Sequence, residues 1–232
     1  MKLSIISPVF KEDKNIISLL DALRKAVKTP FELLLVYDFE EDSTCPVVKN
    51  YVKENKTENI FLVRNNVGSG RGVINAIKTG FRKVKGNAVL ILMADLSDDV
   101  FQIDVMYQLI QQGADIVCAS RYMRGGQKIG GPKFKTLLSR LAGLTLHYIF
   151  GVPTVDATNA FKMYRREVIK DIQIESTGGF EYSLEIVLKA FKKGYRIVEI
   201  PTTWRDREAG KSNFKLMKWL PKYVKTYLKI LR

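Results

Sequence analysis

Three carboxylates stand where a run of apolar residues ends, namely Glu12, Asp38 and Asp95, and Asp98 and Asp99 follow closely behind the third. If these runs are neighbouring parallel strands, their carboxyl ends lie at one edge of a sheet, where open α/β sheets bind ligands. Repelling carboxylates gathered there are explained by a bound divalent cation or by the polar groups of a ligand. The alternative is that each acid caps the helix that follows its strand.

The metal that these acids would bind is expected to be Mg²⁺ or Mn²⁺. The single histidine, His147, lies in an apolar stretch and is expected to be packed or interfacial, and Cys45 and Cys118 have no metal-ligand spacing. Oxygen ligands without a histidine or cysteine cluster favour Mg²⁺ or Mn²⁺ over zinc. Mg²⁺ is typically held by one or two carboxylates together with substrate phosphates, so a substrate containing a diphosphate is the natural partner.

The elements that must position these acids alternate along the first half of the chain. Apolar runs predict strands at residues 3–9, 31–37, 60–63 and 88–93, and amphipathic patterns predict helices at 13–27, 45–55 and 72–84. This alternation predicts a mostly parallel sheet with helices on both faces. The glycine-rich turn at residues 67–72 matches neither the P-loop nor the dinucleotide fingerprint, so a tight turn explains it as well as ligand contact does.

The second half predicts less regular elements. Helices are expected at 100–112, 134–150, 180–193 and 214–232, strands at 115–119, 161–164 and 195–200, and loops at 120–133 and 204–213. We therefore predict one catalytic domain over residues 1–212 and a basic amphipathic helix over residues 213–232.

Four segments in order, residues 8–12, 36–38, 66–70 and 94–97, resemble family-2 glycosyltransferases. In the second half, segments 120–122, 156–162 and 206–212, together with Glu185, are similar to dolichyl-phosphate mannose synthase and its polyprenyl-phosphate relatives. The resemblance implies a single GT-A-like (Rossmann-like) α/β domain that uses a nucleotide sugar as its donor.

The resemblance also implies a role for particular residues. The nucleoside is expected to bind at Pro8, Phe10, Glu12 and Asp38, and the metal and diphosphate at Ala94, Asp95 and Ser97, with Arg207 reaching the phosphates. Asp95 is the expected catalytic residue and, with Ser97, the expected metal ligand. The acceptor phosphate is implied to bind Arg121, Lys135 and Ser139. Two cations and a hydroxyl suit a lipid monophosphate dianion on physical grounds as well.

The sequence departs from the family pattern in three places. Met93 stands where the family usually has the first aspartate of Asp-x-Asp, which leaves Asp95 as the metal anchor, with Ser97 or Asp98 as helpers. Tyr37 stands where a second aspartate is common, and residues 158–161 read Thr-Asn-Ala-Phe in place of Thr-Ser-Gly-Phe. These changes leave the class in place.

The chain of 232 residues carries a net charge of +14, which favours anionic partners such as nucleic acid, acidic lipid headgroups or phosphorylated substrates. No run of 18 apolar residues occurs, so any membrane contact is expected to be peripheral. From Lys211 to Arg232, cations recur every three or four residues beside Trp219, Tyr223 and Tyr227. This pattern is typical of a helix lying in an anionic membrane surface, the alternative being a helix docked on the protein.

Three functions are compatible with these features. The first is an inverting glycosyltransferase that moves a sugar, mannose or glucose, from a nucleotide diphosphate donor to a polyprenyl or dolichyl phosphate. The second transfers the sugar to a saccharide hydroxyl, which requires a base near Asp98, Asp99 or Glu185. The third is a basic nucleic-acid-binding protein, which the lack of a recognition motif argues against. Two cysteines without an obvious partner in the sequence favour a reducing compartment, so we expect a peripheral protein on the cytoplasmic face of a membrane, without a nucleic acid partner.

Overall fold

The computed structural model describes residues 3–207 and 216–229, and of residues 216–219 the backbone only. Several sequence predictions therefore lie outside the described residues. They concern segment 208–212 of the last motif, the side chains of Lys218 and Trp219, and the terminal positions Lys211, Phe214, Lys215 and Arg232.

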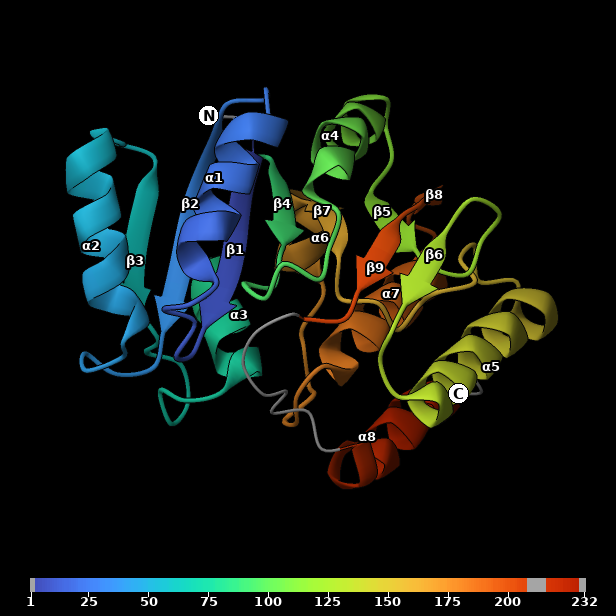
Figure 1. Ribbon diagram of the computed structural model, residues 1–232. Helices are drawn as coiled ribbons and strands as arrows, with labels where there is room; N and C mark the ends of the chain where they lie inside the picture. Colours follow the sequence, from blue (N-terminus) through green and yellow to red (C-terminus); the bar gives the residue numbers. More distant parts are fainter. Residues whose placement is uncertain (1–2, 208–215, 230–232) are drawn as a thin grey trace.

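A mostly parallel sheet forms the centre of the molecule (Figure 1). Its strands are β1 (Leu3–Val9), β2 (Phe31–Tyr37), β3 (Ile60–Arg64), β4 (Ala88–Ile91), β5 (Ile116–Ser120), β7 (Lys162–Arg165) and β8 (Ile197–Pro201). In the described part of the chain they lie in the order β3-β2-β1-β4-β7-β5-β8. β7 runs antiparallel to β4 and β5, and the other neighbours are parallel. The predicted fold class is confirmed.

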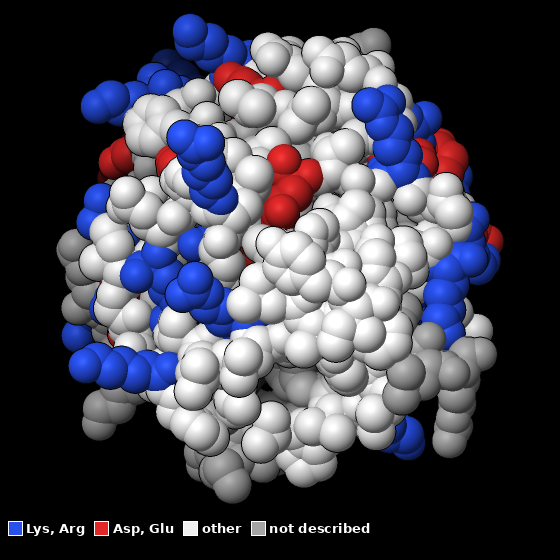
Figure 2. Space-filling view, turned by 90° about the vertical axis from the view of Figure 1, so that its right-hand side faces the viewer, with Lys and Arg blue, Asp and Glu red and all other residues white. Residues whose placement is uncertain are grey.

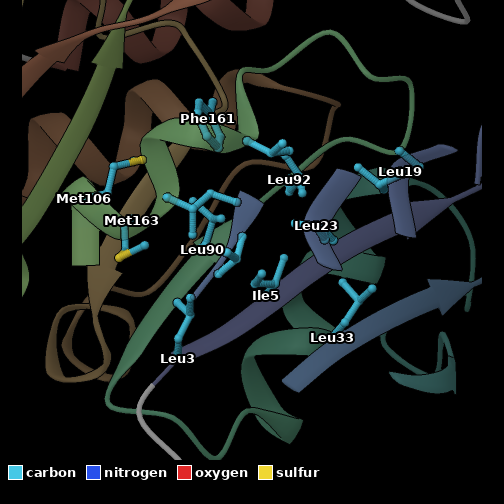
Figure 3. Packing of buried hydrophobic residues seen from close by; sticks show 14 of the residues in the cluster. Leu3, Ile5, Leu19, Leu23, Leu33, Leu90, Leu92, Met106, Phe161 and Met163 are labelled. Atoms are coloured by element: carbon cyan, nitrogen blue, oxygen red, sulfur yellow. The ribbon is translucent and has the colours of Figure 1, made fainter. Parts of the chain in front are cut away.

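Helices cover both faces of this sheet. One face carries α1 (Ile16–Ala26), α2 (Thr44–Asn55) and α4 (Ile103–Gln111), which follows the short 3-10 helix η1 (Val100–Gln102). The other carries α3 (Val73–Lys83), α6 (Arg166–Asp171) and α7 (Glu181–Lys192). Alternating side chains of one strand serve both layers: Leu3 and Ile5 of β1 join Leu19 and Leu23 of α1 (Figure 3), whereas Ile6 packs on the α3 side. Burial on both faces explains why the strands read as continuous apolar runs.

The elements that the sequence did not predict are short. β6 (Gln127–Ile129) and β9 (Thr203–Arg205) pair in parallel as a small second sheet, although both segments were expected to be loops. α6 was missed as well. Three-residue strands have too few residues to show a period, and their pairing joins segments far apart in the sequence. Strand ends shift slightly elsewhere, since β4 ends at Ile91 and β7 begins at Lys162.

Two helices lie at the end of the molecule toward which β1, β2 and β4 point (Figure 1). They are α5 (Lys133–Phe150) and α8 (Leu216–Leu228), which contains Pro221. Tyr227 of α8 donates a hydrogen bond to Thr145 Oγ1 of α5 at 2.8 Å, and its ring contacts Phe150 edge-on. Lys229 forms an ion pair with Glu175 at 2.7 Å. In this part, α8 is docked on the protein, as the alternative interpretation of the terminal helix expected. No helix among the described residues is both long enough and apolar enough to cross a bilayer.

Candidate active site

The carboxyl ends of β1 and β4 form the crevice in which the site is built. The chain continues from β1 to β2 on one side of the sheet, while β4 pairs with β1 on the other side. Such a switch of direction opens a crevice beyond the strand ends. Glu12 follows β1, Asp95 follows β4, and Arg207 spans the two: its Nη2 lies 2.6 Å from Asp95 Oδ2, and its Nη1 lies 3.8 Å from Glu12 Oε1. The structure therefore brings three of the predicted donor residues together.

Asp38 lies at the same edge, after β2, but it has other partners. It accepts hydrogen bonds from Asn65 Nδ2 at 2.8 Å and from the backbone N–H of Gly72 at 2.9 Å. Gly72 precedes α3 and has a φ of 91°, a conformation that favours glycine. Within the described residues no three acidic side chains lie close enough to hold a metal ion together, so the acids share an edge without forming one cluster.

Helix capping does not explain these three acids. The residues before α1, α2 and α3 are Asn15, Ser43 and Gly72, and none of them makes a side-chain capping bond. Asp99 does cap a helix, because it accepts the backbone N–H of Phe101 at 3.1 Å in front of η1. The capping alternative is therefore wrong for Glu12, Asp38 and Asp95 and right for their neighbour.

The turn after β1 is held by buried groups from the loop after β2 and from the start of α2. Lys11 has a φ of 55°, which is uncommon for a residue with a side chain. Its backbone N–H donates to the carboxylate of Asp42 at 3.0 Å, and that of Glu12 donates to Thr44 Oγ1 at 2.9 Å. The Thr44 hydroxyl in turn donates to Asp42 at 2.6 Å. This scaffold leaves the Phe10 ring 44% exposed at the mouth of the crevice, where a flat apolar surface suits a nucleobase.

The loop after β4 contains a second residue with a positive φ, and it contains a buried hydroxyl group that has no hydrogen-bond partner among the described residues. Leu96 has a φ of 60°, and such conformations persist where the surroundings enforce them. Asp95 Oδ1 accepts the backbone N–H of Ser97 at 3.2 Å, and the Ser97 carbonyl accepts that of Arg205 at 3.0 Å. Ser97 is 3% exposed, and its Oγ has no hydrogen-bond partner among the described residues. The bond to Arg205 ties the loop to β9 and so brings Arg207 to Asp95.

Two acids near this loop have raised pKa values. Burial, and then the charge of Asp95, raises the pKa of Asp98 to about 7. Burial also raises the pKa of Glu12, with a smaller contribution from Asp95, against the opposing effects of Asn15 and Arg207. With this pKa, Asp98 could exchange a proton with a hydroxyl acceptor near neutral pH.

Glu185, another of those bases, serves the fold. Its carboxylate is buried and accepts the backbone N–H groups of Glu175 and Ser176 at 2.9 and 2.8 Å. It also pairs with Lys189 at 2.8 Å. A carboxylate bound in this way holds the loop in front of α7 and has little capacity left to accept a proton from a substrate.

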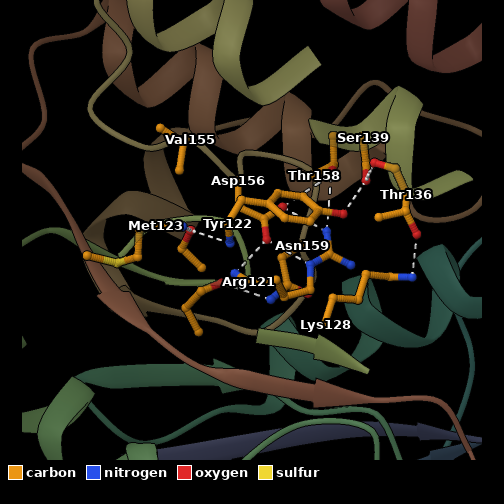
Figure 4. A network of polar contacts seen from close by, with 12 residues as sticks. Arg121, Tyr122, Met123, Lys128, Thr136, Ser139, Val155, Asp156, Thr158 and Asn159 are labelled. Carbon is orange, nitrogen blue, oxygen red and sulfur yellow. Dashed lines mark hydrogen bonds and ion pairs between the residues drawn. The ribbon is translucent and has the colours of Figure 1, made fainter. Parts of the chain in front are cut away.

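The predicted acceptor residues lie beside this crevice on β5 and α5. Arg121 follows β5 and grips the buried carboxylate of Asp156 with Nε and Nη2, each at 2.7 Å, and with its backbone N–H at 2.9 Å (Figure 4). Its guanidinium lies 5.0 Å from the ring centroid of Tyr122, whose hydroxyl is 2.5 Å from Ser139 Oγ. Tyr122 thus brings two of the three predicted acceptor residues together.

Lys135 joins them electrostatically. Burial, and then the charges of Arg121 and Lys128, lowers the pKa of Lys135 from its ordinary 10.5 to about 8. Lys128 comes from β6, donates to Thr136 Oγ1 of α5 at 2.6 Å and lies 4.8 Å from the ring centroid of Trp204 in β9. We call Arg121, Lys128 and Lys135 the cationic cluster. The charge of Asp95 also acts on Lys135, so the cluster and the crevice are neighbours.

Sequence reasoning gave no role to three residues that hold this site. Asp156 and Lys162 lie in a segment that was recognised as a motif, and Lys128 lies in a predicted loop. Lys162 is fully buried, and its Nζ donates to the carbonyls of Ala157, at 3.0 Å, and Asn159 and to Ser183 Oγ at 2.7 Å. It therefore fixes the turn that presents Asp156 to Arg121. A lysine inside an apolar strand was the signal that could have revealed it.

A mostly parallel sheet with acids at its switch point and cations beside them is an α/β arrangement that suits phosphorylated ligands. Residues 4–173 match the sequence model of Glycosyl transferase family 2, and the chain belongs to this family.

Several curated proteins are similar to the chain over most of its length. It is 26% identical to a dolichol-phosphate mannosyltransferase of Pyrococcus furiosus over 220 residues, covering 93% of the chain and 60% of the relative. It is 26% identical to a polyprenol monophosphomannose synthase of Mycolicibacterium smegmatis, covering 90% and 79%, and to an undecaprenyl-phosphate mannosyltransferase of Micrococcus luteus, covering 91% and 87%. The chain thus spans 60% of the length of the Pyrococcus relative.

Solved structures confirm the fold. A crystal structure of a mycobacterial protein is similar with a TM-score of 0.75 at 12% identity, covering 99% of this chain and 74% of that one. Glucosyl-3-phosphoglycerate synthase from Mycobacterium tuberculosis, in complex with Mn²⁺, UDP-glucose and phosphoglyceric acid, is similar with a TM-score of 0.74 at 14% identity, covering 99% and 79%.

Proposed function

We propose that this chain transfers a hexose, mannose or glucose, from a nucleoside-diphosphate sugar to the phosphate of a polyprenyl or dolichyl lipid. The observation that carries the proposal is the cationic cluster beside the crevice. Beyond the Arg121–Asp156 pair, the cluster carries the charges of Lys128 and Lys135, for which a neutral acceptor has no use, whereas a phosphate dianion is bound by charge-assisted hydrogen bonds. The printed names of the three relatives, each of which acts on a polyprenol or dolichol phosphate, support the same acceptor.

On the donor side, we assign the nucleoside to Pro8, Phe10, Glu12 and Asp38, and the diphosphate to Ala94, Asp95, Ser97 and Arg207. A divalent cation fits the same place. Asp95 offers a carboxylate oxygen, and the buried Ser97 hydroxyl has no partner within the described residues and needs one. Asp95 and Ser97 would hold Mg²⁺ or Mn²⁺ together with the substrate phosphates, the arrangement that Mg²⁺ usually adopts in proteins. When bound, the cation supplies positive charge to the departing diphosphate.

In the proposed reaction, an oxygen of the lipid phosphate attacks the anomeric carbon, and the bond from this carbon to the diphosphate oxygen breaks. The nucleoside diphosphate leaves with the bonding electrons. A single displacement inverts the anomeric carbon, so an α-linked donor gives a β-linked lipid product. Because the acceptor is already ionised, the reaction needs no strong general base. Lys135 and Ser139 are assigned to hold the acceptor phosphate, and Arg121, fixed by Asp156, gives it a positive surface.

A saccharide hydroxyl is the second candidate acceptor, and one observation favours it. Asp98 lies next to Asp95 and has a pKa of about 7, which suits a general base for a hydroxyl group. The two candidates differ in their products. Incubation with a panel of nucleotide sugars, Mg²⁺ or Mn²⁺, and either a polyprenyl phosphate or a saccharide distinguishes them. We expect a glycosyl lipid, and a glycosylated saccharide without any lipid product overturns the proposal.

We also propose that the protein works at a membrane, on the cytoplasmic face, since its lipid acceptor lies in the bilayer. The boundary between a catalytic part, residues 1–212, and a terminal basic helix, residues 213–232, remains part of this proposal. The described end of this helix packs on α5 and α7, where Lys229 pairs with Glu175, whereas Lys225 is exposed.

A further inference from the structure

The helix α5 exposes a stripe of large apolar side chains. Phe134, Leu137, Leu141 and Tyr148 are 58%, 54%, 49% and 77% exposed. They stand three, seven and fourteen positions apart from the first, a spacing that places them on one side of a helix. Ile149, which is 69% exposed, widens the stripe at the far end. We call these five residues the α5 stripe.

The other side of α5 explains why this stripe faces outward. Leu146 and Gly143 are buried, and a Cβ on Gly143 would lie only 1.8 Å from the carbonyl oxygen of Val155. Ser139, on the same side, reaches Tyr122 in the acceptor site. The helix is thus fixed by its inner face, and the α5 stripe points away from the domain. Figure 2 shows the side of the molecule on which α5 ends in Figure 1, with a broad area without charged side chains that has Lys and Arg to either side and acidic side chains above it.

The surroundings of the stripe are cationic. Residues 121–155 contain no Asp or Glu, and Lys133 and Arg140 are exposed on α5 itself. The neighbouring helix α8 adds the exposed side chains of Val224, Lys225 and Leu228, and it too contains no acidic residue. An apolar stripe on a helix with cations beside it matches the surface of an anionic bilayer, in which apolar side chains enter the headgroup boundary and cations meet lipid phosphates.

We infer that the α5 stripe inserts into an anionic lipid bilayer and thereby sets the distance of the acceptor site from the membrane. The role given to the stripe rests on the proposed function. The polyprenyl tail of the acceptor must stay in the lipid while its phosphate reaches Lys135 and Ser139 on the inner face of the same helix. It moves the main membrane contact from the terminal helix to α5, with the exposed side of α8 beside it.

Vesicle binding by the complete chain, without substrates, tests the surface directly. Vesicles of phosphatidylcholine and phosphatidylglycerol in equal parts are pelleted with wild type, with Leu137→Gln/Leu141→Gln and with Phe101→Gln/Val105→Gln. The last pair is a matched control, because Phe101 and Val105 are similarly exposed at 62% and 44% near α4. We expect the α5 variant to bind roughly tenfold or more weakly, as the loss of two inserted leucines implies, and the control to bind like wild type.

Insertion itself is measured by fluorescence with brominated lipids. Tyr148→Trp should be quenched in the vesicle-bound state, beyond the signal of the native tryptophans, whereas Phe101→Trp should not. Equal binding by all variants, or no quenching at position 148, overturns the inference. So does a stable dimer of the wild type without lipid that the α5 variant converts to monomer, because the stripe is then covered by a second copy of the chain.

The same variants separate this inference from the proposed function. If the protein binds vesicles through α5 but makes no glycosyl lipid, the membrane surface is supported and the proposed function is contradicted. If wild type and Leu137→Gln/Leu141→Gln make glycosyl lipid equally well, the proposed function is supported and the membrane surface is contradicted. With a water-soluble, short-chain prenyl phosphate, Leu137→Gln/Leu141→Gln should retain wild-type turnover, since the stripe does not touch the acceptor site.

Discussion

On the donor side of the site, each acid stands directly after a parallel strand, and buried groups of neighbouring loops hold the backbone around it. On the acceptor side, the cations come from β5, β6 and α5 and are joined through Asp156, Tyr122 and Thr136. The donor side is thus organised by the sheet, and the acceptor side by side-chain contacts between distant segments. Substitutions on the donor side should affect chemistry, whereas those on the acceptor side should affect affinity or folding.

The largest effect is expected at Asp95, the anchor of the donor side. Asp95→Asn removes the carboxylate that fits the cation and that Arg207 contacts, so turnover should fall by about a thousandfold or more. Thermal unfolding should change little, because asparagine has the same shape as aspartate and the residue lies in the loop beyond the end of β4. Asp99→Asn, in the same loop, should keep its helix cap, because asparagine caps a helix about as well as aspartate, and turnover should stay within a few fold. Near-normal turnover of Asp95→Asn would contradict the assignment of the donor site to Asp95.

Arg121→Ala should act mainly on folding. It leaves the carboxylate of Asp156 buried without its partner, which costs about 3–5 kcal/mol of unfolding free energy. Urea unfolding measures this loss, and Arg124→Ala, an exposed neighbour, should change stability by less than about 0.5 kcal/mol. Adding Asp156→Asn to Arg121→Ala should recover part of the loss. If Arg121→Ala is as stable as wild type, the pair does not organise the acceptor side.

Lys135 offers a second test of acceptor binding, because its charge lies beside those of Arg121 and Lys128 in the cationic cluster. Lys135→Gln should raise the Michaelis constant for a short-chain prenyl phosphate roughly ten- to a hundredfold, the loss of one charge-assisted contact. The constant for the nucleotide sugar should stay within a few fold, as should both constants of Lys133→Gln. Equal changes for both substrates would assign Lys135 to the donor or to the fold.

Arg207 lies on the donor side and should oppose metal binding in the absence of nucleotide, because its guanidinium lies 2.6 Å from Asp95. Arg207→Gln should bind Mn²⁺ about tenfold more tightly than wild type without nucleotide, as expected when a neighbouring cation is removed. Donor binding should weaken, since the variant loses a phosphate contact. Calorimetry measures both, with the exposed Arg205→Gln as the control. Unchanged Mn²⁺ affinity shows that Arg207 does not compete for Asp95.

The smallest effect concerns pH. Lys135 has a pKa of about 8, so its cationic form, which binds the acceptor, is present below that pH and is lost above it. The value of kcat/KM for the prenyl phosphate should therefore fall about tenfold per unit above pH 8, while Lys135→Arg, which stays charged, should lose this alkaline limb. An alkaline limb that persists in Lys135→Arg belongs to another group.

The difference between the donor side and the acceptor side also explains which parts of the site could be predicted from the sequence. Glu12 and Asp95 follow from strand periodicity, because a parallel sheet places every strand end at one edge. The resemblance to family 2 indicated Arg207 and Ser139, but not how they are held. The pairing of β6 with β9, the grip of Asp156 on Arg121 and the anchoring by Lys162 depend on contacts between segments more than 15 positions apart. No local pattern encodes such contacts, so the sequence left these segments as loops and motifs without a role.

The exposure of α5 was not predictable either. In the sequence, its apolar residues look like those of any packed helix, whereas the regularly spaced lysines of the terminal helix predicted the membrane contact there. The structure shows that Gly143 and Leu146 make the packed face, which leaves the α5 stripe outside.

Formation of the product tests the central claim most directly. The complete chain is incubated with GDP-mannose or UDP-glucose, Mg²⁺ or Mn²⁺, and a polyprenyl phosphate in vesicles, and the lipid fraction is examined by mass spectrometry and for anomeric configuration. We predict a β-linked glycosyl phosphate lipid from wild type and none from Asp95→Asn. A wild type that glycosylates a saccharide hydroxyl and leaves the lipid phosphate unmodified with every donor contradicts the account.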